Sequence, residues 1–384
     1  MSGVTIHQVA AEAGVSPSTV SNVLNGRSGR MLPQTRERIE QAIERLGYRP
    51  NRAARQLRTG RIQVIGLVVP SVANPFWGTF ARHLEGAALA EGYHVLLCNS
   101  ERDPQRERRY LEELWADGIR GVVLCSSLPS LAHVLPLVDR GLGMVAFDRT
   151  AQAGDPESLV NISVDNVVGA GLAAKHLLDL GHRRLAFVSG SLGSVNRRER
   201  FRGFTSALEA AGIDPSSALV WSGASEEPFG DRDAAGLGRD AAGLGRDAAG
   251  LGRAATHELL HEPFGDRDAA GLGRAAAHEL LREPDPPTAI VAINDMCALG
   301  VCAGIRDAGL RVGADVSVVG FDDIVLADLA APALTTVRQP LAEMAAAAFA
   351  HLRTRIETGG NEGGRSILLR PELVIRASTV ARGG

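Results

Sequence analysis

The sequence is poor in cysteine and has no long apolar run, and each scarcity excludes a class of protein. The four cysteines among its 384 residues lie far apart or inside apolar runs: Cys98, Cys125, Cys297 and Cys302. We therefore expect reduced thiols, and neither a disulfide framework nor a metal site. No run of about 18 apolar residues exists to span a bilayer, and residues 1–14 lack the layout of a secretory signal. These absences predict a cytoplasmic protein with no membrane partner and no cofactor.

Acidic residues are scarce at the start of the chain. Residues 1–60 contain nine Arg and four Glu, a net charge of +5, whereas the whole chain carries −3, so the remaining residues sum to −8. The length is sufficient for two or three domains, each with its own core. A small basic module on a mildly acidic body indicates a polyanionic partner for the N-terminal module alone.

The first fifty residues carry the signals of three short helices. Thr5 to Gln8 has the form of a capping box, Gly14 ends the first helix, and Ser16-Pro17 begins the second. The second helix, near 17–24, has small polar residues on one side and valines on the other. A third is predicted near 33–46. Two short helices around a glycine turn are the helix-turn-helix plan for the major groove of DNA. A plain three-helix bundle with a solvated polar face is the alternative.

From residue 62 onward, apolar runs alternate with amphipathic stretches. The runs are IQVIGLVV, HVLLCN, GVVLC, GMVAFD, LVNISV, RLAFVSG, TAIVAI and VSVVGF, and helical patterns lie near 76–90, 103–117, 131–140, 166–180, 197–211 and 295–308. Continuous apolar strands with helices between them predict parallel sheets that are covered on both faces. There are enough of them for two doubly wound lobes, which bind ligands beyond the carboxyl ends of their strands.

Polar and aromatic residues that follow these strands are the candidates for a ligand pocket. They are Asn74, Phe76, Trp77, Asp148, Arg149, Asp165, Arg198, Asn294 and Asp322. Carboxylates and arginines beside an aromatic ring suit a polyhydroxylated ligand, because bidentate groups bind pairs of hydroxyls. The simpler alternative is that some of them only cap helices, as Asp148, Asp165 and Asp295 each precede a predicted helix. Asp322-Asp323 lacks a third ligand at metal-binding spacing.

One phrase is repeated within the second predicted lobe. EPFGDRDAAGLGR occurs at 227–239 and again at 262–274, so that units 227–261 and 262–282 form a local duplication. The repeated heptad Arg-Asp-Ala-Ala-Gly-Leu-Gly holds two glycines, each of which costs about 1 kcal/mol relative to Ala in a helix. A loosely packed helix and a surface excursion are both compatible with this pattern. We interpret the repeat as a duplication that the fold tolerates.

The first copy also contains a match to a zinc motif. His257–His261 reads HELLH, the H-E-x-x-H pattern of metalloproteases. The second copy reads HELLR at 278–282, so a single codon change after duplication explains the second histidine. A zinc metalloprotease is therefore the enzyme alternative, and we expect instead that the protein is not an enzyme.

Several motifs in order resemble the LacI/GalR family of bacterial transcription regulators. VTIHQVAAEAGVSPSTVSNVLNG is similar to the family's DNA-binding headpiece and LGYRPNRAARQLRTGR to its hinge. GLVVPSVANPFW, FDR, GHRRLAFVSG, AIND, SVVGFDD and LTTVRQP are similar to its regulatory core. The resemblance covers residues 4–380 except the repeat.

The resemblance implies an all-α helix-turn-helix headpiece followed by an α/β periplasmic-binding-protein-like core of two doubly wound parallel-sheet lobes. The headpiece would be 1–48 and the hinge helix and linker 49–61. The first lobe would be 62–163, joined by about 340–358. The second would be 164–338 with about 366–380, and would contain the insert at 227–282.

By the same resemblance, the second helix enters the major groove, with Pro17, Ser18 and Asn22 toward base edges and Thr19 and Ser21 toward phosphates. Asn22 can pair with adenine. Leu57 would be a wedge in the minor groove at the centre of an inverted-repeat operator bound by a homodimer; a core leucine is the alternative. The complete predicted DNA-binding set is Thr5, Ser16, Pro17, Ser18, Thr19, Ser21, Asn22, Asn25, Asn51, Arg52, Ala54, Arg55, Leu57 and Arg58.

The implied function is that of a ligand-responsive, sequence-specific transcription regulator, a repressor controlled by a sugar or a related small molecule. Arg149, Arg198, Asn294 and Asp322 would contact this effector, and Phe76 or Trp77 would stack on it. A nucleobase or nucleoside is the alternative effector. A solute-binding protein of a transporter would share the two-lobe fold, but it would need a secretory signal and no headpiece.

Overall fold

The computed structural model describes residues 4–24, 31–48, 63–222, 269–359 and 366–382. The chain divides into two compact units, Met1–Ile62 and Gln63–Gly384, and each has its own hydrophobic core. Among the described helices, none is both long and apolar enough to cross a membrane.

The smaller unit contains α1 (Ile6–Ala13), α2 (Pro17–Leu24) and α3 (Pro33–Leu46). The predicted capping box is present, since the Thr5 amide donates to Gln8 Oε1 at 2.8 Å and the Gln8 amide donates to Thr5 Oγ1. Gly14 ends α1 with φ 63°, a conformation that favours glycine. Val9, Val20 and Ile39 bury one face of each helix in a shared core. The three helices predicted from the sequence are confirmed.

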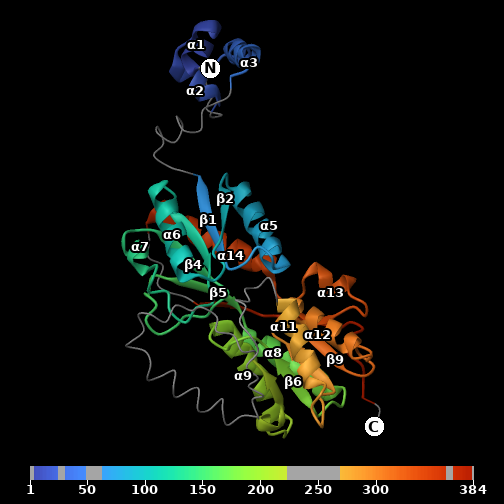
Figure 1. Cartoon of the computed structure of the whole chain (residues 1–384). Helices are drawn as coiled ribbons and strands as arrows, with labels where there is room; N and C mark the ends of the chain where they lie inside the picture. The colour runs from blue at the N-terminus through green and yellow to red at the C-terminus, as the bar shows by residue number, and fades with distance from the viewer. Residues whose placement is uncertain (1–3, 25–30, 49–62, 223–268, 360–365, 383–384) are drawn as a thin grey trace. The chain divides into compact units, whose positions relative to one another are not determined.

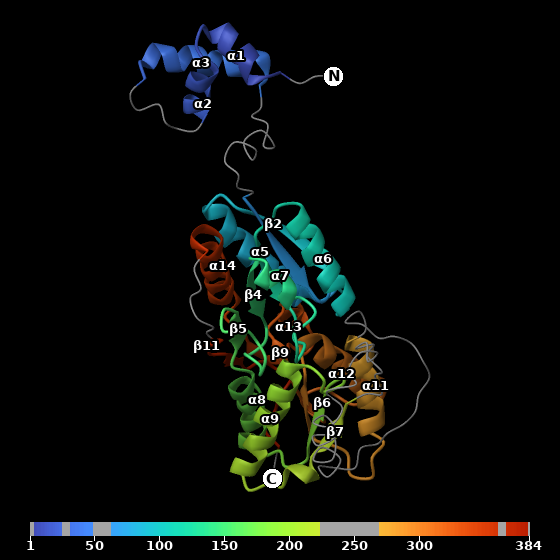
Figure 2. The same ribbon diagram turned by 90° about the vertical axis from the view of Figure 1, so that its left-hand side faces the viewer.

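The first lobe of the larger unit is built on a parallel sheet of six described strands in the order β11-β5-β4-β3-β1-β2. The strands are β1 (Val64–Val69), β2 (His94–Asn99), β3 (Gly121–Cys125), β4 (Gly143–Phe147), β5 (Val160–Val164) and β11 (Ser366–Leu369). The helices are α5 (Pro75–Ala90), α6 (Pro104–Ala116), α7 (Leu135–Asp139) and α14 (Leu341–Thr358). α5 and α14 pack together on one face of the sheet and α6 covers the other (Figure 2).

The second lobe has the same strand order, with six described strands in the order β12-β10-β9-β8-β6-β7, but its edge strand β12 runs antiparallel to β10. The strands are β6 (Leu185–Val188), β7 (Leu219–Trp221), β8 (Ala289–Ala292), β9 (Ser317–Asp322), β10 (Thr335–Arg338) and β12 (Glu372–Val374). The helices are α8 (Asn166–Asp179), α9 (Val195–Ala210), η1 (Pro215–Ser217), α11 (Ala269–Leu280), α12 (Asp295–Asp307) and α13 (Val325–Leu329). α8 packs on α9, and α11 packs on α12 (Figure 1). The predicted alternation of strands and helices is confirmed in both lobes.

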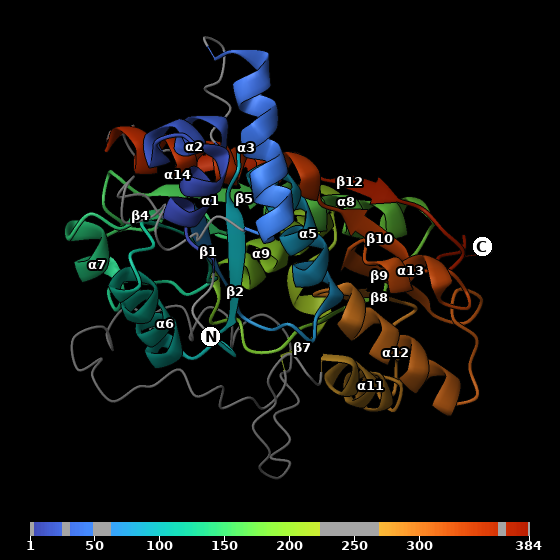
Figure 3. The same cartoon turned by 90° about the horizontal axis from the view of Figure 1, so that it is seen from above.

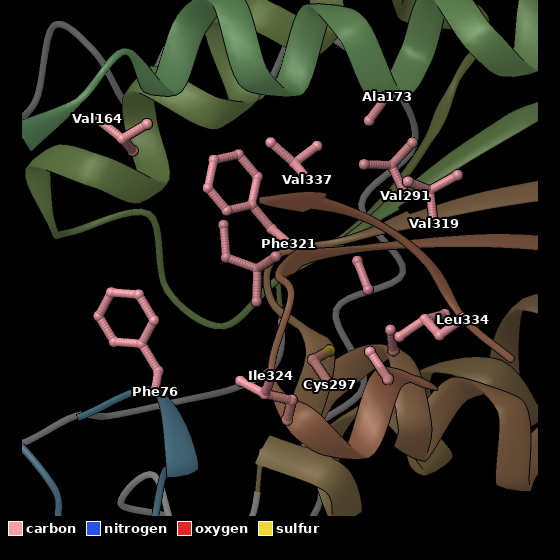
Figure 4. Packing of buried hydrophobic residues seen from close by; sticks show 14 of the residues in the cluster. Phe76, Val164, Ala173, Val291, Cys297, Val319, Phe321, Ile324, Leu334 and Val337 are labelled. Carbon is pink, nitrogen blue, oxygen red and sulfur yellow. The ribbon is translucent and has the colours of Figure 1, made fainter. Parts of the chain in front are cut away.

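The core of the second lobe lies on both faces of its sheet. Phe321 and Val337 extend toward α8, where a Cβ on Gly169 would lie 2.8 Å from the Phe321 ring. Cys297 and Leu334 lie on the opposite side, at α12 (Figure 4). Apolar strands covered on both faces therefore form the frame that holds the strand ends in place.

The chain crosses between the lobes three times in the described residues, after β5, after β10 and after β11. β11 pairs with β5 in the first sheet, whereas β12 pairs with β10 in the second. The expectation that 366–380 belongs entirely to the second lobe is therefore corrected, because 366–369 lies in the first. A short edge strand has no hydrophobic pattern that shows which of two sheets it joins.

The second copy of the repeat is described from residue 269 onward, where Ala269–Leu280 forms α11 beside α12 (Figure 3). A Cβ on Gly273 would lie 2.0 Å from the carbonyl oxygen of Cys297, so glycine is what lets the two backbones approach. Arg274 and His278 both contact Asp307, and Trp221 Nε1 donates to Glu279 Oε2 at 2.8 Å. The glycines that weaken an isolated helix thus permit this close packing. The first copy lies outside the described residues.

Candidate functional site

A cavity of about 50 Å³ lies where the carboxyl ends of the two sheets face each other. This is the position at which doubly wound sheets bind ligands. The first lobe contributes Pro70, Asn74, Phe76, Trp77, Arg102, Cys125, Ser127 and Asp148 to its lining. The second lobe and the crossover after β10 contribute Ser194, Asn196, Arg197, Arg200, Ile293, Asn294, Asp322 and Gln339. The cavity therefore depends on both lobes.

The structure brings together most of the residues that the sequence singled out for a pocket. The six that line the cavity are Asn74, Phe76, Trp77, Asp148, Asn294 and Asp322. Asn74 and Asn294 also cap helices, since Asn74 Oδ1 accepts from the Phe76 amide at 3.1 Å and Asn294 Oδ1 accepts from the Cys297 amide at 2.9 Å. Capping orients each amide group, because one oxygen is fixed by the helix that begins there.

Three of the predicted pocket residues do not line the cavity. Arg149 is fully buried and its guanidinium pairs with Asp155 at 3.0 Å. Asp165 caps α8 by accepting from the Val168 amide. Arg198 donates to the carbonyl of Gly193 at 3.0 Å. Each side chain is held by a local partner outside the lining.

The arginines of α9 that do line the cavity are Arg197 and Arg200. They are three residues apart, so they lie near the same face of the helix, whereas Arg198 points elsewhere. The helical periodicity of α9 would predict Arg200 as a lining residue only if the side of the helix that faces the cavity were known. Arg102, at φ 60° after β2, and Gln339, after β10, carried no signal in the sequence.

Aromatic rings form one wall of the cavity. The Phe76 and Trp77 rings meet edge to face with centroids 4.8 Å apart, and Trp77 also meets Phe147 edge to face. Phe80 stacks on Phe147 at 3.8 Å. Because these rings pack on one another, the wall is part of the core of the first lobe.

Asp148 is the acidic residue of the first lobe in this cavity. Its backbone has φ 62°, and its Oδ2 accepts from Asn196 Nδ2 of the second lobe at 2.7 Å. Burial raises the pKa of this carboxyl from 3.8 to about 6, although the charge of Arg200 and the bond from Asn196 oppose the rise. Among the described residues, no donor reaches its buried Oδ1.

Asp322 is the acidic residue of the second lobe, at the end of β9. Gln339 Nε2 donates to its Oδ1 at 2.8 Å, and Arg200 lies 3.8 Å from the same oxygen. Arg200 is fixed in turn, because it donates to Asn166 Oδ1 and to the carbonyl of Ile293 and lies 3.6 Å from the centre of the Phe321 ring. Gln339 Oε1 is buried, and no described donor reaches it.

Two further contacts join the lobes next to the cavity. Thr150 Oγ1 of the first lobe donates to Glu199 Oε1 of α9 at 2.6 Å, and the Val195 amide donates to the carbonyl of Ser127 at 2.9 Å. Together with the bond between Asn196 and Asp148, they attach the first turns of α9 to the first lobe.

The candidate DNA-contacting face of the headpiece is the polar side of α2. Ser18 and Asn22 are exposed and one helical turn apart. Ser16 caps α2, as its Oγ accepts from the Thr19 amide at 3.2 Å, and Thr5 caps α1. Pro17, Thr19 and Ser21 are partly buried. The other residues predicted to contact DNA lie outside the described residues: Asn25, Asn51, Arg52, Ala54, Arg55, Leu57 and Arg58.

The zinc motif at His257–His261 also lies outside the described residues. In the second copy, His278 contacts Asp307 at 3.0 Å and Glu279 accepts from Trp221. No group of three or more possible metal ligands occurs in the described part of the chain.

Comparison with protein families matches three successive parts of the chain. Residues 5–51 match bacterial regulatory proteins of the lacI family, and residues 62–235 match the periplasmic binding proteins and sugar binding domain of the LacI family. Residues 174–379 match the periplasmic binding protein-like domain.

Characterised relatives match over nearly the full length. The regulator DegA of Bacillus subtilis is 32% identical over 98% of both chains, and the repressor PurR of Mannheimia succiniciproducens is 30% identical over 97% of this chain and 98% of its own. Among solved structures, a lac repressor dimer bound to operator and an anti-inducer has a TM-score of 0.75 at 26% identity and covers 99% of this chain and all of its own. A complex of the regulator CelR with cellobiose has a TM-score of 0.63 at 29% identity, with 98% and 99% covered.

Proposed function

The chain belongs to the LacI family of bacterial regulatory proteins and is a DNA-binding transcription regulator, and from this premise we propose that it is a repressor switched by a small molecule in the cavity between its lobes. The observation that carries the proposal is the cavity itself, to which both lobes contribute polar and charged side chains. A ligand there contacts both lobes at once, so its binding energy depends on how they close. The site of action is the compartment that holds the DNA, the cytoplasm.

Operator recognition is assigned to α2 and to the hinge. Ser18, Asn22 and Pro17 would face base edges, and Thr19 and Ser21 would face phosphates. Leu57 is proposed from the sequence to be a wedge in the minor groove, and its neighbouring arginines Arg52, Arg55 and Arg58 to contact phosphates. The net charge of +5 in residues 1–60 supports a phosphate-binding role for this part of the chain.

The active species is proposed to be a homodimer. Exposed apolar side chains occur on the edge strand β2, at Leu96 and Leu97, and on α13, at Val325 and Leu329. Apolar side chains of this size on an edge strand and on a short helix favour burial against a second copy. A dimer with twofold symmetry matches an inverted-repeat operator.

The effector is proposed to be a sugar. Asp148 Oδ1 and Gln339 Oε1 are buried acceptors without a described donor, and hydroxyl groups of a polyol would supply donors to both. The ring of Trp77 and the guanidinium of Arg200 complete a set of groups suited to a polyhydroxylated ring. A nucleobase or nucleoside remains the second class to include in a ligand screen.

The switch is proposed to act through the closure of the lobes. An effector that binds one closure better shifts the population toward it, and operator affinity changes by the same coupling free energy. The contacts of α9 with the first lobe, through Asn196 and Glu199, belong to the closure seen here.

Two experiments test the proposal. A thermal-shift screen of the full chain against sugars and nucleosides should reveal a ligand, because a compound at about 100 times its Kd adds roughly 2.7 kcal/mol of stability. A selected inverted-repeat operator should bind with a steep salt dependence, and Leu57→Ala should weaken this binding while the dimer stays folded. Equal operator affinity of the mutant and the parent would contradict the wedge, and a screen without any ligand would contradict the effector.

A further inference from the structure

The turn after β9 has an unusual backbone. Asp322 has φ 120° and Asp323 has φ 55°, so two successive residues with side chains have positive φ. Such conformations are unfavourable for residues other than glycine, and they persist where the surrounding structure holds them. The contacts around this turn show what holds it.

Asp323 lies between two guanidinium groups. Its Oδ2 accepts from Arg338 Nε at 2.7 Å and its Oδ1 accepts from Arg376 at 2.7 Å. The Asp323 side chain is only 10% exposed and that of Arg376 15%, so water screens this pair weakly, whereas the Arg338 side chain is 47% exposed. Arg376 is itself fixed, because it donates to the carbonyl of Leu334 at 2.8 Å. The carboxylate of Asp323 therefore ties the turn to β10 and to the segment after β12.

Asp295 holds the same turn from the side of α12. Its Oδ2 accepts from the Ile324 amide at 2.8 Å, and its Oδ1 accepts from Thr336 Oγ1 of β10. Asp295 is fully buried, and a Cβ on Gly320 would lie 2.2 Å from its Oδ1, so the glycine leaves room for this carboxyl. The turn is thus bonded at its backbone as well as at its side chain.

The partners of the turn are consecutive in the chain. Arg338 binds Asp323, and the next residue, Gln339, donates to Asp322 Oδ1 at 2.8 Å. Directly after Gln339 the chain crosses from β10 to α14 in the first lobe. A movement of Asp322 therefore acts on the start of a crossover between the lobes.

We propose that Asp323, held by Arg338 and Arg376, is a positioning residue that sets the direction of the Asp322 carboxylate in the cavity and links it to the crossover after β10. Asp323 itself does not line the cavity. The inference rests on the proposed function only because it takes Asp322 to contact the effector.

The test compares two variants that each remove one carboxylate from the same guanidinium. Asp323→Asn removes the buried partner of Arg376 and keeps a residue type that tolerates positive φ. Asp328→Asn removes the exposed partner, which lies 3.3 Å from Arg376 Nε with a side chain that is 74% exposed. Both variants change the net charge equally, so a difference between them reports position and not charge.

The first readout needs no ligand. Amide hydrogen exchange of the full chain, followed in peptides spanning 322–326 and in β6 as a reference, should become at least tenfold faster at the turn in Asp323→Asn and stay unchanged in Asp328→Asn. Equal exchange at the turn in both variants would overturn the proposal. So would faster exchange in β6 to the same extent, because that indicates a general loss of stability.

The second readout is the affinity for D-ribose, D-xylulose, D-glucose and cellobiose, measured by calorimetry on the same proteins. For any of these sugars that binds the parent, Asp323→Asn should weaken binding about tenfold and Asp328→Asn should leave it unchanged. Unchanged affinity in Asp323→Asn overturns the positioning role. If none binds the parent, the proposed effector class is contradicted for these sugars, and the exchange result still decides whether Asp323 holds the turn.

Discussion

The two lobes have the same strand order but hold their acidic turns in different ways. In each lobe the fourth strand along the chain, β4 or β9, ends at an aspartate with positive φ that lines the cavity, Asp148 or Asp322. Asp322 is bound by Gln339 and is followed by Asp323, which is fixed by two arginines. Asp148 is bound by Asn196, a residue of the other lobe. We therefore expect the turn in the second lobe to be preformed and the environment of Asp148 to depend on closure.

The lobes also differ in how their helices pack. In the first lobe, aromatic rings of α5 pack on one another and on Phe147 of the sheet. In the second, α11 and α12 approach through glycines, and a Cβ on Gly300 would lie 1.8 Å from the carbonyl oxygen of Ala270. The same strand order therefore accommodates an aromatic core in the first lobe and close glycine contacts between helices in the second. The two should differ in how much stability an added methyl group costs.

The largest effect is expected from adding that methyl group. Gly300→Ala should lower the free energy of unfolding by about 3 kcal/mol, because the backbone of α11 must move away. Gly86→Ala in α5, where a Cβ meets nothing within 4 Å, should instead raise it by about 1 kcal/mol through helix propensity. Denaturant unfolding of both variants measures the difference. Equal stability changes would show that the glycine contact is not what joins α11 to α12.

The next effect concerns the two acidic residues of the cavity. Asp322→Asn should weaken effector binding by about 2 kcal/mol, since a charged acceptor is lost from a fixed position. Asp148→Asn should cost less, about 1 kcal/mol, because burial already raises the pKa of Asp148 and one of its oxygens is bound to Asn196. Calorimetry with a ligand from the screen gives both values. A larger loss for Asp148→Asn would reverse the assignment of preformed and closure-dependent turns.

A smaller effect is expected from pH through Asp148 of the first lobe. With a pKa of about 6, Asp148 is mostly protonated at pH 5.5, so effector binding should be about fourfold weaker there than at pH 7.5 if the ionised form is needed. The pKa of the folded state lies above 3.8, so this group adds stability as pH falls through 6 toward 4 and loses it as pH rises. Its charged neighbours are Arg200, Arg102 and Glu199. In Asp148→Asn the dependence of binding on pH between 5.5 and 7.5 should disappear, and its persistence would assign it to another group.

The smallest effect is expected from deleting the first copy of the repeat. Residues 100–103 join β2 to α6 in the first lobe, whereas residues 222–268 join β7 to α11 at the corresponding place in the second. Deletion of 227–261 should leave operator and effector affinity unchanged and add at most about 1 kcal/mol of stability, because loop length costs little entropy. Thermal unfolding and operator titration of the deletion variant provide the measurement. An insoluble variant, or one without operator binding, would show that the first copy is structural.

Much of the fold could be predicted from the sequence because its signals are local. The capping box at Thr5, the glycine after α1 and the apolar runs of the strands each depend on neighbours a few residues away. The same locality explains why Asn74 and Asp322 could be placed at strand ends and hence near a cavity. That they bind an effector stays a prediction.

Other features depend on partners that are distant in the chain, and only the tertiary structure decided them. Arg198 and Arg200 are both arginines of α9, but only the orientation of the helix places Arg200 beside Asp322 and leaves Arg198 on Gly193. Gln339 reaches the cavity because β10 lies next to β9, and 366–369 belongs to the first sheet because it pairs with β5. The glycines of α11 lower the helix propensity of this segment in isolation, but they allow the helix to pack closely on α12. Sequence patterns report periodicity along one element, whereas these outcomes depend on the distance between two elements.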